Sequence, residues 1–99
     1  MRNVNDARGF AVLENGRHLQ TAAMILEPGE ASGPLANEHA QSEQILFVVS
    51  GEVEAQIGEQ RFTMRPGDSA IVPTGTPHRF TNGARERAVT FNVYSPKAY

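Results

Sequence analysis

The sequence predicts an all-β domain of the sandwich or barrel type. Short apolar segments of strand length recur along the chain, separated by turns that are rich in Gly and Pro. Residues 53–57 alternate apolar and polar side chains at every second position, and no segment shows convincing helical periodicity. At 99 residues the chain has room for one domain, which we expect to span residues 1–99.

Charge and composition exclude several classes of protein. The formal net charge is -2 and the nine Lys and Arg residues are scattered, so no basic surface for nucleic acid or for an anionic membrane is expected. No apolar run approaches the roughly 20 residues of a membrane span, which makes the cytoplasm the expected location. Because the chain has no cysteine, a metal would have to be held by nitrogen and oxygen ligands.

The first quarter of the chain predicts an arm followed by two strands. Residues 1–9 are polar and aperiodic, so we expect a loose arm or one that pairs with a partner. A strand is expected at residues 10–14, and Asn15-Gly16 predicts a two-residue hairpin, since both positions of a type I′ turn need positive φ. Residues 18–26 predict a second strand, which ends at Pro28-Gly29, a pair that suits a type II turn.

Residues 36–47 allow two interpretations. In a helix, His39 and Glu43 would lie one turn apart on the same face. Residues 45–49, however, are rich in β-branched and aromatic side chains and are bounded by Ser50-Gly51, which is typical of a buried strand. We therefore expect a strand, with the helix as the alternative.

The second half of the chain predicts a series of short strands. Residues 53–57 and 60–64 form a predicted hairpin, because Gly58-Glu59 has Gly where a type II′ turn requires it. Further strands are expected at residues 70–72, 78–81 and 88–94, with loops at residues 65–68 and 73–77 and a turn at Asn82-Gly83.

One spacing in this half resembles a known motif. The pattern Gly67-x5-Pro73-x-Gly75-x2-His78-x3-Asn82 is similar in full to the second motif of the cupin superfamily. The fifteen residues between Gly51 and Gly67 match the spacer of its small members. The resemblance covers about residues 20–95.

The first cupin motif is matched less completely. Counting back from Gly51 places Gln44 at the acidic or amide ligand position, His39 at the second histidine and Asn37 at the first. Asn37 and Gln44 are both neutral, so the inferred ligand set has no charge to offset a divalent cation. Metal affinity is therefore expected to fall relative to the family pattern.

Similarity to cupins implies a double-stranded β-helix, or jelly-roll barrel, and commonly a homodimer. It also implies a divalent metal ion in the barrel mouth, Mn, Fe, Ni or Zn, held by His39, Gln44 and His78, with Asn37 as a further candidate. By strand alternation, Leu46 shares a face with Gln44 and Phe80 shares one with His78, which makes both expected pocket residues. His18 lies outside both motifs and is expected on the surface.

Two functions follow from the resemblance. The first is a metal-binding protein that coordinates a small oxygen-rich organic molecule, as an isomerase, a decarboxylase or a dioxygenase would. The alternative is a non-catalytic module that binds a small ligand and has a relaxed metal site. Neither nucleic acid nor a membrane is an expected partner.

Overall fold

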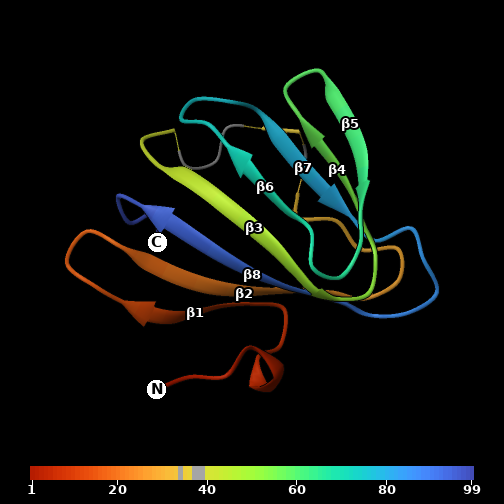
Figure 1. Ribbon diagram of the computed structural model, residues 1–99, viewed down its shortest axis with the longest axis horizontal. Coiled ribbons are helices and arrows are strands. Elements are labelled where there is room, and N and C mark those ends of the chain that lie inside the picture. Colours follow the sequence, from red (N-terminus) through yellow and green to blue (C-terminus); the bar gives the residue numbers. More distant parts are fainter. Residues whose placement is uncertain (34, 37–39) are drawn as a thin grey trace.

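The computed structural model describes residues 1–33, 35–36 and 40–99 and consists of two antiparallel sheets (Figure 1). One sheet has the strand order β1-β2-β8-β3-β6 and the other the order β5-β4-β7. The strands are β1 (Phe10–Asn15), β2 (Gln20–Leu26), β3 (Glu43–Ser50), β4 (Val53–Ile57), β5 (Gln60–Met64), β6 (Ser69–Val72), β7 (His78–Thr81) and β8 (Ala88–Ser95). This architecture confirms the predicted all-β, double-stranded β-helix fold. Among the described residues, no helix has the length and apolar character to cross a membrane.

The predicted strands agree most closely with the structure where residues alternate clearly. Strands β4, β5 and β7 begin and end at the predicted residues. Strand β3 begins at Glu43, so the segment 43–47 is extended and the helical alternative is wrong there. Burial along β3 alternates from Glu43 to Val48, with the even-numbered side chains buried and the odd-numbered ones exposed.

The predicted hairpin joins β1 and β2, but the two-residue type I′ turn expected at Asn15-Gly16 is wrong. Strands β1 and β2 are joined by a longer connection, in which Asn15 pairs with Gln20 and the Gly16 N–H donates to Leu19 O at 2.7 Å. Positive φ in the described chain occurs at Gly residues alone, and neither Asn15 nor Gly16 adopts it. A type I′ turn needs positive φ at both positions, and the chain instead turns through a four-residue loop, residues 16–19.

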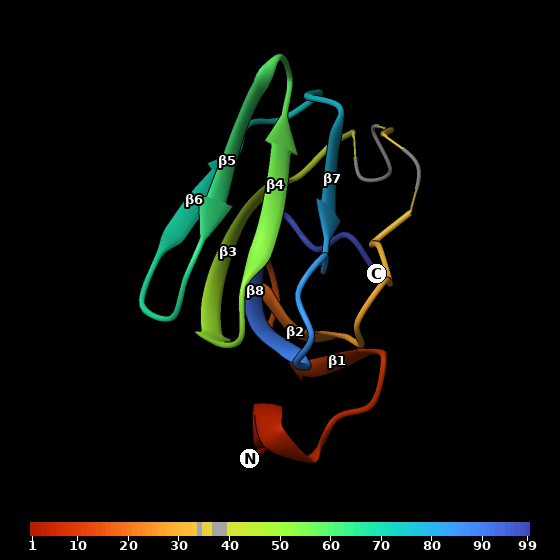
Figure 2. The same cartoon turned by 90° about the vertical axis from the view of Figure 1, so that its right-hand side faces the viewer.

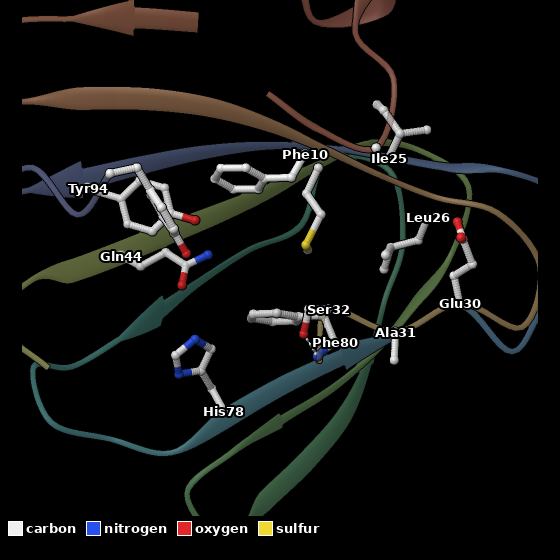
Figure 3. Close-up of a pocket in the computed structure, with 13 residues that line it drawn as sticks. Phe10, Ile25, Leu26, Glu30, Ala31, Ser32, Gln44, His78, Phe80 and Tyr94 are labelled. Carbon is white, nitrogen blue, oxygen red and sulfur yellow. Dashed lines mark hydrogen bonds between the residues drawn. The ribbon is translucent and has the colours of Figure 1, made fainter. Parts of the chain in front are cut away.

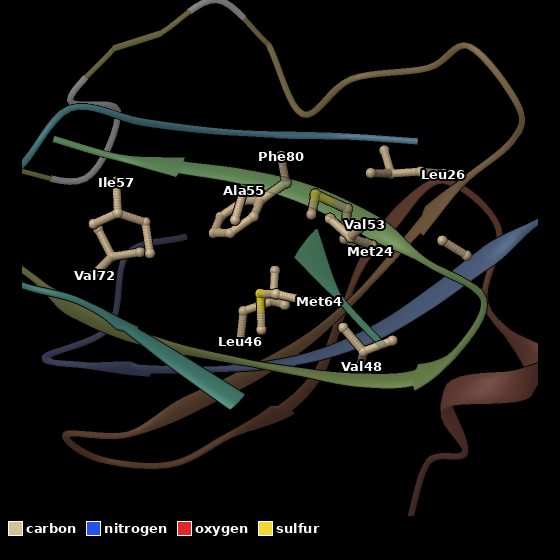
Figure 4. Close-up of a cluster of buried hydrophobic side chains, with 11 residues drawn as sticks. Met24, Leu26, Leu46, Val48, Val53, Ala55, Ile57, Met64, Val72 and Phe80 are labelled. Atoms are coloured by element: carbon tan, nitrogen blue, oxygen red, sulfur yellow. The ribbon is translucent and has the colours of Figure 1, made fainter. Parts of the chain in front are cut away.

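The main hydrophobic core lies between the two sheets (Figure 4). Phe80 and Leu46 are the largest of its fully buried side chains, and they come from opposite sheets. Both pack with apolar side chains that strand alternation turns inward. The buried members of this core are Met24, Leu26, Leu46, Val48, Val53, Ala55, Ile57, Met64, Val72, Phe80 and Ala88.

The N-terminal segment covers part of the outer face of the five-stranded sheet. A short 3-10 turn, η1 (Val4–Asp6), lies below β1 in Figures 1 and 2. Val4 packs against a second cluster that includes Ala23 and Ile25 of β2. The Ile25 N–H also donates to Gly9 O at 2.8 Å. Strand β2 is therefore buried on both faces, while pairing of this arm with a partner stays a prediction.

Hydrogen bonds to the outer edge of β7 bring the two motif regions together. The Ser32 N–H donates to Phe80 O at 2.8 Å, and the Phe80 N–H donates to Ser32 Oγ at 2.9 Å. Nearer the other end, Ala36 and His78 exchange main-chain bonds of 3.0 and 3.4 Å. The segment that precedes Asn37 in the sequence is thus fastened to the strand that carries His78.

Candidate functional site

A cavity of about 310 Å³ opens between the two sheets, within the size range of small-molecule sites (Figure 3). Gln44 from β3 and His78 from β7 face one another at one end, and Glu30 lies at the other. Glu30 is the one Asp, Glu, Lys or Arg among the described lining residues, which are Gly9, Phe10, Met24, Ile25, Leu26, Glu30, Ala31, Ser32, Gln44, His78, Phe80, Tyr94 and Tyr99.

The His78 ring is buried and is oriented by its own loop. Its Nδ1 lies 3.0 Å from Thr76 O. Because a carbonyl oxygen only accepts, Nδ1 carries the hydrogen at this contact. Histidines that bind metals commonly donate their other ring N–H to a main-chain carbonyl in this way. The contact therefore fixes the orientation of the His78 ring in the cavity.

The Gln44 side chain is buried and has one satisfied end. Its Nε2 donates to Asn92 Oδ1 at 2.8 Å. Its Oε1 is buried and has no hydrogen-bond partner among the described residues. An unsatisfied buried oxygen costs on the order of 1–3 kcal/mol, so this atom favours a ligand that brings a hydrogen-bond donor or a positive charge.

Apolar side chains form the walls between the two ends of the cavity. Phe80 lies beside the His78 ring, with ring centroids 6.0 Å apart, as the alternation along β7 predicted. Leu46 is not among the described lining residues. Its exposed fraction is 0%, and its side chain lies in the core. The prediction that Leu46 lines the pocket is therefore corrected: on β2, Met24 takes a place in the wall instead.

Aromatic rings close the rim beside Gln44. The Tyr99 ring lies 4.6 Å from the Phe10 ring and 5.2 Å from the Tyr94 ring, measured between centroids. Buried Gln20 fastens this end of the chain, since its Nε2 donates to Tyr99 O at 2.6 Å and its Oε1 accepts the Tyr99 N–H at 2.9 Å. Segments from both ends of the sequence thus meet at the cavity.

The predicted ligand set stays a prediction. The structure brings Gln44 and His78 to the same cavity, whereas Asn37 and His39 lie outside the described residues. His18 is exposed, as expected. Within residues 1–33, 35–36 and 40–99, no three His, Cys, Asp or Glu side chains gather into a group that could hold a metal ion. The described donors that fit a metal are one imidazole nitrogen and one amide oxygen.

Several site residues were missed by the sequence analysis. Thr90, Asn92 and Tyr94 share the inward face of β8, and all three are buried. Alternation along residues 88–94 would have grouped them, and two polar residues on the inward face of an apolar strand are unusual enough to mark a site. What the sequence lacked was the pairing of β8 with β3, which puts Asn92 beside Gln44.

Comparison with known families and proteins agrees with this fold. The family model described as "Cupin domain" matches residues 22–94. The HTH-type transcriptional regulator PuuR of Escherichia coli is 30% identical over 91 residues, which cover 89% of this chain and 48% of that protein. The chain therefore spans about half the length of the curated relatives it matches.

Solved structures share the fold. A protein from Bacillus halodurans superimposes with a TM-score of 0.89 at 24% identity, over 97% of this chain and 76% of that one. A sugar phosphate isomerase from Silicibacter pomeroyi superimposes with a TM-score of 0.75 at 25% identity, over 90% of this chain and 60% of that one.

Proposed function

Because the chain belongs to the cupin family, we propose that it binds a divalent metal ion and a small organic molecule in the cavity between its sheets. In this proposal His78, Gln44 and His39 hold the metal, and Asn37 is a further ligand. One observation carries it: the buried Oε1 of Gln44 has no hydrogen-bond partner among the described residues, and Gln44 faces the His78 ring across one end of the cavity. Amide oxygens and imidazole nitrogens both bind divalent metals, and Gln44 and His78 lie at the same end of the cavity.

The neutral character of these ligands affects both affinity and ligand choice. His, Gln and Asn side chains leave the charge of a divalent ion uncompensated, so binding is expected to be weaker than in a site with a carboxylate. An organic ligand that presents partly anionic oxygens to the metal would supply the missing charge. When bound, such a metal polarises a carbonyl or enol oxygen, chemistry that isomerases, decarboxylases and dioxygenases use.

The walls indicate what else the organic ligand contains. Phe80, Met24 and Leu26 form an apolar surface that excludes water and favours an apolar portion of the ligand. No Lys or Arg lies among the described lining residues, and residues 34 and 37–39 are Pro, Asn, Glu and His. A phosphate group would therefore lack the cationic side chains that usually bind it. We propose a ligand with oxygens at one end, an apolar body and no phosphate.

Metal content tests the first part of this proposal. Elemental analysis of freshly purified protein, never exposed to a chelator or to a metal-affinity column, should find about one metal ion per chain. His78→Ala should lose it, because the variant removes a nitrogen ligand. The matched control is His18→Ala, which removes an exposed histidine outside the cavity and should keep the metal. Absence of metal from the unmodified protein, even after incubation with Mn, Fe, Ni or Zn, would overturn the assignment.

A second candidate is a ligand-binding module without catalysis or a metal, and the neutral Gln44 and Asn37 favour it. The two candidates differ in what raises the thermal unfolding midpoint, since a ligand that binds only the native state stabilises it by mass action. A metal site predicts a rise with Mn, Ni or Zn. A metal-independent module predicts a rise with an organic ligand in metal-free buffer and none with the ions.

For partners we propose a homodimer. Ile45 of β3 and Ile71 of β6 are directly paired on the outer face of the five-stranded sheet and are 45% and 53% exposed. Exposed apolar residues that lie together often mark a protein interface, and the neighbouring Phe47 extends this pair.

Domain extent 1–99, a cytoplasmic location and the absence of nucleic-acid or membrane partners stay predictions.

A further inference from the structure

A directed chain of buried hydrogen bonds leads from the main chain of β2 to the cavity. Thr90 Oγ1 donates to Met24 O at 2.8 Å. Asn92 Nδ2 donates to Thr90 Oγ1 at 3.1 Å and to Ala22 O at 3.3 Å. Gln44 Nε2 then donates to Asn92 Oδ1 at 2.8 Å. Thr90, Asn92 and Gln44 are between 0% and 3% exposed, so water does not compete for these bonds.

The direction of this chain follows from the two carbonyls at its start. Carbonyl oxygens only accept, so the Thr90 hydroxyl donates to Met24 and its own oxygen accepts from Asn92. Both donors of the Asn92 amide are used in this way, and its oxygen is left to accept. Gln44 must therefore direct its NH2 group toward Asn92, and its Oε1 is the atom that remains for the cavity.

A glutamine amide has nearly the same shape in either orientation, so shape alone does not choose between oxygen and nitrogen. A reversed Gln44 would direct N–H groups at the cavity, where a metal ion or a ligand donor would be repelled. We propose that Asn92, held by Thr90, is a positioning residue that selects the acceptor orientation of Gln44. This role rests on the proposed function, and it explains how the neutral Gln44 side chain can bind a cation or a hydrogen-bond donor.

Metal affinity measured in two backgrounds separates positioning from simple stabilisation. In the unmodified background, Asn92→Leu should weaken Mn²⁺ binding by at least about 10-fold in titration calorimetry, the effect typical of losing a group that orients a ligand. In the Gln44→Glu background the same substitution should change Mn²⁺ affinity by less than about 3-fold, because a carboxylate presents an oxygen in either orientation. A structural role would lower affinity equally in both backgrounds, and that result would overturn the proposal.

A metal-free measurement keeps this proposal distinct from the metal assignment. In NMR spectra of ¹⁵N-labelled protein, the Gln44 NH2 protons should show cross-peaks to Asn92 and none to the His78 ring. In Asn92→Leu, or in Thr90→Val if the first variant does not fold, cross-peaks to the His78 ring should appear. If the unmodified protein binds no Mn²⁺ but behaves in this way, the metal assignment fails and the positioning role stands. Cross-peaks that are the same in all folded variants would overturn the positioning role.

Discussion

The two motif regions orient their acceptor atoms by different means. In the second motif, His78 Nδ1 bonds to Thr76 O, two residues back in the same loop. In the first, the Gln44 amide depends on Asn92, which is 48 residues away along the chain. A local motif can therefore prescribe the ring of His78, whereas Gln44 needs the sheet to form before its oxygen and nitrogen are distinguished.

The glycines of the two motifs also differ, one being fixed by distant contacts and the other by local conformation. Gly51 ends the first motif with φ +79°, and a Cβ built there would lie 2.4 Å from Arg87 O and 2.7 Å from the Ala88 Cα. Gly75, in the second motif, has φ +78°, but nothing lies within 4 Å of its would-be Cβ. The first motif is thus set by close packing against a distant segment, and the second by backbone conformation alone.

The largest effect is expected from substituting these glycines as a matched pair. Gly51→Ala combines the strain of positive φ with a main-chain clash and should cost roughly 2–5 kcal/mol of unfolding free energy. Gly75→Ala carries the φ strain alone and should cost about 1–2 kcal/mol. Urea denaturation measures both values. Equal losses would show that packing at Gly51 does not matter and would remove this difference between the motifs.

A smaller loss is expected at the end of the second motif. Asn82 is fully buried; its Nδ2 donates to Leu26 O at 2.8 Å and to Glu86 O at 2.7 Å, and its Oδ1 accepts the Ala84 N–H at 2.9 Å. Asn82→Ala leaves these main-chain groups without their partner and should cost about 1–3 kcal/mol.

Thermal and urea unfolding of Asn82→Ala give that cost. Asn82→Asp serves as the control, because it keeps an acceptor for Ala84 but removes both donors. If Asn82→Ala is as stable as the unmodified protein, the second motif ends in a simple turn, and the tertiary bond to Leu26 contributes nothing.

The smallest effect on the free energy of unfolding is expected on the outer face of the five-stranded sheet. Substitutions there should instead change how the chain assembles. Ile45 follows Gln44 on β3 but points away from the cavity, and it pairs with Ile71. Replacing both residues with Lys should change the unfolding free energy of the isolated chain by no more than about 0.5 kcal/mol, as is usual for surface positions.

In solution the same double variant should sediment as a monomer if the unmodified protein is a dimer through this face. Replacement of two exposed residues with Lys is the control and should leave the mass unchanged: Glu59, in the turn between β4 and β5, and Gln60, the first residue of β5. A dimer that survives the Ile45 and Ile71 substitutions would place the interface elsewhere.

Part of the cavity lining could be predicted, because alternation along a strand shows which residues share a face. Alternation along β7 placed His78 and Phe80 on one inward face, and both line the cavity. The same alternation placed Leu46 with Gln44 on β3, but the second inward position from the strand end lies under the core and not in the cavity wall. The two-residue period of a strand predicts which face of the sheet a side chain occupies. It does not predict whether that side chain lies in the core or at the cavity.

The sequence by itself determined the strands, most of the turns and the face on which Gln44 and His78 lie. These depend on side-chain alternation and on a few Gly and Pro residues, which act over short stretches of chain. The tertiary structure alone decided that Met24 and Tyr94 complete the wall and that Gln44 presents oxygen to the cavity. The physical reason is that a hydrogen-bond partner chooses between the two ends of an amide, and the partner of Gln44 arrives only when β8 pairs with β3.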